Sequence, residues 1–196
     1  MSEALLAPVP HALHSLYFMI KPEHGAALAA HAVMKDARAR HGLRGGVVDS
    51  ERQHVTLHAL GDYAERPVDL VERARRAGAA VDVEPFEVAF DRLVGWGPEA
   101  RLLALRGDSR AMRGLRVLQR AVAAAMVDEG LGHLARSSFR PHVSLLYGDQ
   151  ALPAEAIEPI HWCVDELLLI ESVFGAGEHR MLGRWPLVRR QGRLPW

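Results

Sequence analysis

The amino-acid sequence predicts an α+β fold assembled from two similar halves. Short segments with the apolar or alternating pattern of strands flank longer segments with helical periodicity. The order strand, helix, strand occurs twice, and the later strand opens both times with the tetrad His-Val-Thr/Ser-Leu, at His54–Leu57 and His142–Leu145. We interpret this recurrence as a divergent duplication, although the two halves share little sequence identity outside the tetrads.

The first half of the chain carries a strand, a helix and a second strand. Residues 15–20 (SLYFMI) are a continuous apolar run typical of a buried strand, and an alanine-rich helical pattern follows over residues 23–40. Residues 53–60 (QHVTLHAL) alternate polar and apolar side chains, as expected of a half-buried strand. Residues that break regular structure separate these elements: Lys21-Pro22, Gly42, Gly45, Gly46, and a turn at Gly61-Asp62.

The rest of the chain repeats this order with additional strands. Helices are predicted over residues 68–80 and 110–129, and strands over residues 86–93, 101–105 and 142–147. A hairpin through Gly95-Trp96-Gly97-Pro98 would join the first two of these strands. We expect residues 166–174 and 181–187 to finish the second sheet, and residues 189–196 to form a frayed tail.

Length and cysteine content narrow the class of protein. A chain of 196 residues suits one domain or two tightly joined lobes, and we expect residues 1–196 to form a single bilobed domain. Cys163 is the only cysteine, which excludes an intrachain disulfide and a cysteine-based zinc site. A reducing cytoplasm is the simplest location for such a chain.

The net charge and the N-terminal sequence further limit the class of protein. Residues 1–25 lack a charged leader region and are interrupted by prolines, so we expect no signal peptide and no membrane span. The formal net charge of zero argues against binding a long polyanion, so any RNA contact should be short and local. We expect a monomer.

The paired tetrads place a histidine and a hydroxyl on the same face of a strand. Side chains two residues apart share a face, about 6.5 Å from each other, so His54 and Thr56 project together, as do His142 and Ser144. Two such strands facing each other would put two imidazoles on opposite sides of one phosphorus atom. One His-x-Thr among eleven histidines means little, but chance is the weaker explanation for two in equivalent strand contexts.

This arrangement fits the in-line displacement that opens a cyclic phosphodiester. One group must take a proton from the attacking water while another gives a proton to the leaving ribose oxygen. Histidine suits both roles because its ordinary pKa is about 6.5. The hydroxyls of Thr56 and Ser144 would donate hydrogen bonds to the non-bridging oxygens as charge develops there. This chemistry needs no metal and no cofactor.

The sequence resembles the 2H phosphoesterase superfamily, specifically its bacterial and archaeal branch of RNA 2′,3′-cyclic phosphodiesterases, also called 2′-5′ RNA ligases. Besides HVTL and FRPHVSLL around the tetrads, the resemblance includes LYFMIKP near the start, PFEVAF after the second helix, and DELLLIESVFG and RMLGRWPL near the end. It therefore covers nearly the whole chain. The resemblance implies two antiparallel sheets that form a central cleft, with helices packed on their outer faces.

The resemblance also implies roles for the tetrad residues. His54 and His142 would be the acid and base, and Thr56 and Ser144 the hydroxyls that hold the phosphate. The substrate would be an RNA end or small nucleotide with a 2′,3′-cyclic phosphate, and the product a 2′-phosphate. The sequence does not say which histidine activates the water.

Two positions depart from the pattern of the family. Ser144 stands where threonine is commoner, which keeps the hydroxyl donor. Tyr147 stands where many relatives carry an arginine, and as a candidate phosphate-binding residue it offers one weaker donor and no charge. Phosphate affinity or substrate choice is therefore expected to differ, and Arg140 or Arg52 could compensate. Tyr17, where relatives often carry phenylalanine, is the candidate for stacking on a base.

Two other functions remain open from the sequence. Ligation of 2′-5′ RNA, or hydrolysis of another small cyclic or 2′-5′ phosphodiester, would use the same four residues. A module that binds a nucleotide or RNA end without turnover would keep the same pocket, and the Tyr147 departure favours it slightly. His58 lies four residues after His54, and we expect it to face solvent on the same side of the strand.

Overall fold

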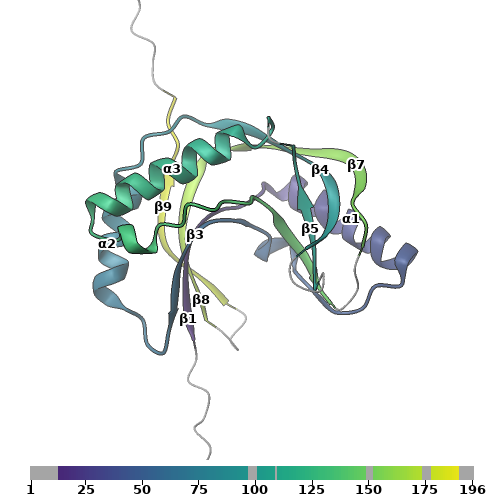
Figure 1. Cartoon of the computed structure of the whole chain (residues 1–196), viewed down its shortest axis with the longest axis horizontal. Helices are drawn as coiled ribbons and strands as arrows, with labels where there is room; N and C mark the ends of the chain where they lie inside the picture. Colours follow the sequence, from purple (N-terminus) through teal and green to yellow (C-terminus); the bar gives the residue numbers. More distant parts are fainter. Residues whose placement is uncertain (1–12, 97–100, 109, 149–151, 174–177, 190–196) are drawn as a thin grey trace, which may run out of the picture.

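The protein folds into two antiparallel sheets with helices packed against them, which confirms the α+β class (Figure 1). The computed structural model describes residues 13–96, 101–108, 110–148, 152–173 and 178–189. Phe174, Gly97-Pro98 of the predicted hairpin and the tail from residue 190 lie outside the described residues.

The first sheet has four strands in the order β3-β1-β8-β9. They are β1 (His14–Ile20), β3 (Val55–Tyr63), β8 (Glu166–Val173) and β9 (Glu178–Pro186). The prediction that β8 and β9 finish the second sheet is wrong, because β8 pairs with β1. The predicted turn at Gly61-Asp62 is also wrong: β3 continues to Tyr63, and Gly61 adopts a positive φ of 124° that glycine tolerates within a strand irregularity.

The second sheet has five strands in the order β2-β6-β5-β4-β7. They are β2 (Gly46–Val47), β4 (Phe86–Trp96), β5 (Leu102–Arg106), β6 (Val143–Tyr147) and β7 (Glu155–Val164). β4 runs through Gly95 and Trp96, where the sequence predicted the start of the hairpin. β7 was not predicted at all, although it pairs with β4 along most of its length.

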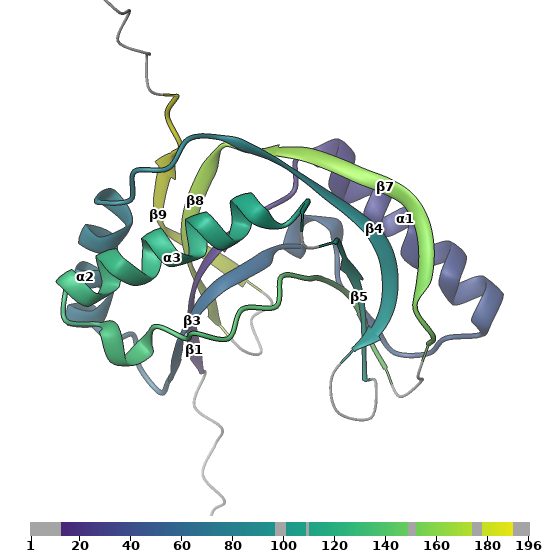
Figure 2. The same ribbon diagram turned by 45° about the horizontal axis from the view of Figure 1, so that its top comes forward.

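Three α-helices cover the sheets on two sides (Figure 2). α1 (His24–His41) packs against β6 and β7, and its buried residues Ala26, Ala30, Met34 and Ala37 form one stripe along the helix. α2 (Val68–Ala79) packs against β8 and β9, and α3 (Arg113–Asp128) packs against α2. Apolar residues from both sheets and all three helices belong to one buried cluster.

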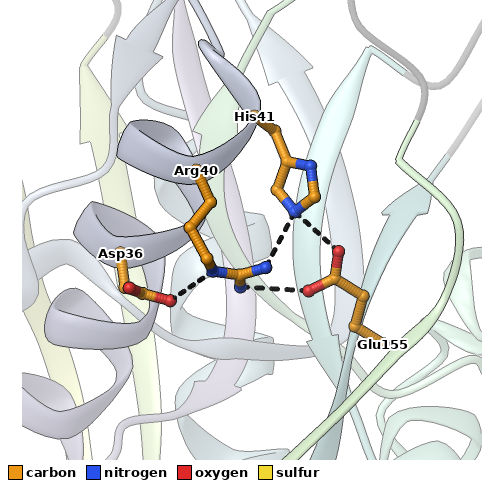
Figure 3. A network of polar contacts seen from close by, with 4 residues as sticks. All are labelled: Asp36, Arg40, His41 and Glu155. Carbon is orange, nitrogen blue, oxygen red and sulfur yellow. Dashed lines mark hydrogen bonds and ion pairs between the residues drawn. The ribbon is translucent and has the colours of Figure 1, made fainter.

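An ion-pair network ties the end of α1 to the start of β7 (Figure 3). The Arg40 guanidinium lies 2.7 Å from an Asp36 oxygen and 3.0 Å from a Glu155 oxygen, and His41 Nε2 lies 2.7 Å from the other Glu155 oxygen. Arg40 is 46% exposed and Asp36 is 64% exposed, so the network is a surface feature that contributes little stability.

A second network centres on a buried carboxylate in the four-stranded sheet. The Glu171 side chain is fully buried, and Arg66 binds both of its oxygens while His14 Nδ1 lies 2.7 Å from one of them. Hydrogen bonding from Arg66 holds the pKa of Glu171 below its ordinary value, so the carboxylate stays charged. Glu171 therefore fixes β8 to β1 and to the segment that follows β3.

Candidate active site

The two tetrads lie at equivalent places, at the start of β3 and at the start of β6. His54 and His142 each precede the first strand residue, and Thr56 and Ser144 are the second residues of their strands. All four side chains are half-buried. The electrostatic interaction with His142 is among the causes that lower the pKa of His54, so the two imidazoles lie within electrostatic range of each other.

Each histidine is anchored by the backbone two residues before it. His54 Nδ1 lies 2.7 Å from the Arg52 carbonyl oxygen, and His142 Nδ1 lies 2.9 Å from the Arg140 carbonyl oxygen. A carbonyl oxygen can only accept a hydrogen bond, so Nδ1 carries the proton in both rings. In the neutral form of either ring, Nε2 is then a proton acceptor, and in the charged form it is a donor.

A β-bulge occurs at the leucine of each tetrad. On β3, Thr56 pairs with Met19 and His58 with Phe18, so Leu57 is the extra residue. On β6, Ser144 pairs with Ala104 and Leu146 with Leu103, so Leu145 is the extra residue. Each bulge therefore reverses the alternation of side chains at the same point after the hydroxyl.

The bulges decide which later residues share a face with the hydroxyls. Ala59 pairs with Tyr17, two residues along β1 from Met19, so Ala59 lies on the Thr56 face. Tyr147 pairs with Leu102, two residues from Ala104, so it lies on the Ser144 face. Without the bulge Tyr147 would point to the opposite side of the sheet.

The bulge at Leu57 also corrects the expectation for His58. His58 shares a face with Phe18 in the core rather than with His54, and it is only 1% exposed. Its Nε2–H donates to the carbonyl oxygen of Gln119 on α3 at 2.9 Å. Desolvation lowers the pKa of His58, so the ring is a neutral structural residue.

His54 lies in a crowded, positively charged environment. Burial lowers the pKa of His54, the hydrogen bond to the Arg52 carbonyl partly opposes this, and the charges of Lys21, His142 and Arg52 lower it further. The Lys21 ammonium donates to the Glu51 carbonyl oxygen at 2.6 Å, which fixes this charge beside the tetrad. His54 is consequently neutral near pH 7, with Nε2 as an acceptor.

A third histidine, His179 on β9, contacts His54 and was missed by the sequence reasoning. The two ring centroids are 5.7 Å apart with an interplanar angle of 71°, an edge-to-face contact. Burial, His54, Arg52 and Lys21 together lower the pKa of His179 to about 4, so this ring is also neutral near pH 7. Its Nδ1 is buried and has no hydrogen-bond partner among the described residues.

Strand twist explains how His179 reaches His54 from the other edge of the sheet. His54 precedes one end of β3, whereas His179 pairs with Ser172 at the opposite end of β8. Twist brings diagonally opposite corners of a sheet toward the same side, and bulges increase that twist. Register shifts occur in both the β1–β3 and the β8–β9 pairs. In the sequence, His179 lies two residues before the strand predicted over residues 181–187, and no motif includes it.

The other predicted contact residues take different positions. Tyr17 lies on the Thr56 face and packs on an apolar cluster of Met19, Leu168 and Ile170. Tyr147 lies on the Ser144 face and is 58% exposed. Arg140 is exposed, and its backbone carbonyl anchors His142. Arg52 and Arg140 each stand two residues before a catalytic candidate, a repeat that the sequence displays as Arg-x-His-Val-Thr/Ser-Leu.

The structure also bears on metal ligands and membrane spans. Within the described ranges, no three His, Cys, Asp or Glu side chains come together as a metal site would require. No helix in the described part of the chain combines the length and apolar character needed to span a bilayer.

Two antiparallel sheets, with a His-Val-Thr/Ser-Leu tetrad at the start of β3 and of β6, are the features expected of the 2H phosphoesterase class. The sequence model of the 2′-5′ RNA ligase superfamily matches residues 26–173. The chain therefore belongs to the 2′-5′ RNA ligase superfamily, a family of 2H phosphoesterases.

Solved structures share the fold. Escherichia coli LigT in its apo form is 24% identical with a TM-score of 0.66, and the match covers 91% of this chain and 99% of LigT. LigT complexed with 3′-AMP is 25% identical with a TM-score of 0.65, over the same shares of the two chains. TT0787 of Thermus thermophilus is 18% identical with a TM-score of 0.67, over 88% of this chain and 97% of its own. The comparison with curated proteins found no match.

Proposed function

We propose that this protein hydrolyses 2′,3′-cyclic phosphates at RNA ends to 2′-phosphates, without a metal ion, by acid–base catalysis with two histidines. The observation that carries the proposal is the pair of equivalent strands, each beginning after a histidine and carrying a hydroxyl two residues later, together with the electrostatic influence of His142 on His54. Membership of the superfamily supports phosphoester chemistry. Crystal structures of LigT with 3′-AMP, with phosphate and with ATP support a nucleotide ligand.

His54 is the proposed general base. Its Nδ1–H is held by the Arg52 carbonyl, so Nε2 carries the lone pair that accepts a proton from water. Burial and the neighbouring charges of Lys21 and His142 lower the pKa of His54 and keep the ring neutral. The water oxygen then bonds to phosphorus as its proton moves to Nε2.

His142 is the proposed general acid. In its charged form Nε2–H points away from the anchored Nδ1, and it gives its proton to O3′ as the bond between phosphorus and O3′ breaks. The products are a 2′-phosphate and a free 3′-hydroxyl. Thr56 and Ser144 donate to the non-bridging oxygens as charge develops there, and exchange with solvent restores both imidazoles.

Purified protein in EDTA, supplied with a nucleoside 2′,3′-cyclic phosphate, tests the proposal. We expect turnover to the 2′-phosphate with a bell-shaped pH profile, followed by chromatography of the product. Loss of turnover in EDTA that returns with a divalent metal would contradict the two-histidine mechanism.

The same preparation separates the alternative functions. A joined product from RNA halves, one with a cyclic phosphate and one with a 5′-hydroxyl, would indicate 2′-5′ ligation, which uses the same residues with a hydroxyl in place of water. Tight binding of the cyclic nucleotide without turnover would indicate a binding module.

A further inference from the structure

A cavity of about 540 Å³ lies beside the proposed site, between the first sheet and the segment that follows the short helix η3 (Gly132–Leu134). This segment runs past β3 to the start of β6 (Figure 2). The residues that matter for its chemistry are Tyr17, Ala59, Asp62, Arg136, Ser137 and Ser138. No step of the proposed reaction uses this cavity.

Three residues that line the cavity, Tyr17, Ala59 and Asp62, lie on the face of the first sheet that carries Thr56. Along that face, Met19 pairs with Thr56, Tyr17 with Ala59 and Ser15 with Asp62. Met19 to Ser15 is four residues of strand, or about 13 Å at the usual rise. Asp62 therefore lies from Thr56 at a distance comparable with the length of a nucleoside monophosphate.

Tyr17 gives this cavity an aromatic surface on which a base can stack, and the small side chain of Ala59 leaves room for that base. Tyr17 is supported from one side by the apolar cluster of Met19, Leu168 and Ile170, and it also lines the cavity. Ala59 is the fifth residue after His54, the position that Tyr147 occupies after His142. The small side chain on β3 leaves room where the other half of the molecule carries a large ring.

Two hydrogen bonds from buried side chains hold the opposite wall of the cavity in place. His58 Nε2–H donates to the Gln119 carbonyl at 2.9 Å, and Gln119 Nε2 donates to the Arg136 carbonyl at 2.9 Å. His58 and Gln119 are 1% and 6% exposed. Two buried residues thus connect β3 through α3 to the cavity wall, which fixes the backbone of Arg136 relative to β3.

We propose that this cavity binds the nucleobase of the substrate and selects guanine. The inference rests on the phosphodiesterase function proposed above. Guanine alone combines N–H donors at N1 and N2 with acceptors at O6 and N7. The Asp62 carboxylate, held by a 2.5 Å hydrogen bond from the Ser15 hydroxyl, accepts from the donors, and the Arg136 guanidinium donates to the acceptors. Adenine would present an acceptor, N1, to Asp62.

Steady-state kinetics with the four nucleoside 2′,3′-cyclic phosphates tests this inference. We expect kcat/KM for the guanosine substrate to exceed that for adenosine by at least about tenfold, the usual discrimination of one good bidentate contact. Asp62→Asn should lower the guanosine-to-adenosine ratio about tenfold, and Arg136→Gln should lower it as well. Asp69→Asn, which alters an exposed carboxylate on α2, is the matched control and should keep the ratio.

Calorimetry with guanosine 2′-phosphate and adenosine 2′-phosphate separates this inference from the proposed function, because binding needs no turnover. Turnover of all four substrates at similar rates, or a ratio that Asp62→Asn leaves intact, would overturn the guanine pocket while the phosphodiesterase stands. Selective binding of the guanosine nucleotide without turnover of any substrate would support the guanine pocket and contradict the phosphodiesterase function.

Discussion

The His54 tetrad and the His142 tetrad share a backbone geometry but differ in what surrounds them. Both have the Nδ1 anchor two residues upstream and the bulge at the leucine. Around His54 are Lys21, Arg52 and a third imidazole, His179, whereas the Ser144 face carries the exposed Tyr147. The shared carbonyl anchor sets the tautomer of both rings, and the different surroundings are the basis for the proposed roles of His54 as base and His142 as acid.

Alanine substitutions at the two histidines should have the largest effects and test most directly whether the two tetrads have different proton-transfer roles. His54→Ala and His142→Ala should each lower kcat/KM by at least about 10²-fold, because each removes one proton-transfer group. Only His54→Ala should abolish the acid limb of the pH profile, since that limb reports protonation of the base. His161→Ala, on the exposed side of β7, is the control. A wild-type rate in either variant would remove that histidine from the mechanism.

Substitutions at the hydroxyls test whether the two tetrads hold the phosphate equally. Thr56→Val and Ser144→Ala should each lower kcat by about 10²-fold, the usual loss for one donor to a developing oxyanion. Thr56→Ser and Ser144→Thr keep the donor and should stay close to wild type. Unequal losses would mean that one tetrad provides most of the stabilisation.

The two ion-pair networks extend the comparison to stability. Glu171→Gln should lower the free energy of unfolding by about 3 kcal/mol, the lower end for a broken buried pair because Arg66 is 40% exposed. Glu155→Gln, at the exposed network, should cost less than about 1 kcal/mol. Urea unfolding measures both, and equal losses would contradict the difference in burial.

The pH dependence of the Glu171 contribution has a definite sign. Its folded-state pKa is lowered, so its stabilisation is complete above the unfolded-state pKa. That contribution is lost as the pH falls through the folded-state value. Glu171→Gln should therefore flatten the loss of stability on acidification.

Substitution of His179 should have the smallest effect on the rate, and that effect should be confined to the acid limb of the pH profile. His179→Ala admits water to His54, which raises the pKa of His54 toward its ordinary value and moves the acid limb to higher pH. We expect a loss of about threefold on that limb and almost none at alkaline pH. His179→Phe keeps an aromatic ring in place and should shift the limb less. A uniform loss at all pH values would indicate a structural role only.

The tetrads and most elements could be predicted because their patterns are local. The alternation in residues 53–60 placed His54 and Thr56 on one face, and the helical spacing placed α1 and α2 within a residue or two of their ends. β7 was missed because Pro159 and its polar neighbours do not resemble a strand, and proline is tolerated there because β7 is at the edge of its sheet.

Features that depend on pairing could not be predicted in the same way. A bulge adds one residue without changing the alternation that the sequence displays, so His58 was placed on the wrong face and the shared face of Tyr147 and Ser144 went unseen. β8 joins the first sheet by pairing with β1, more than 140 residues away along the chain, and β9 joins it by pairing with β8. The approach of His179 to His54 depends on the curvature of that sheet.

The Nδ1 anchors have a mechanical consequence. Each imidazole is oriented by a carbonyl within its own short segment, so neither depends on the opposite sheet for its protonation geometry. The nitrogen that is available for proton transfer is therefore fixed within the segment that carries each ring.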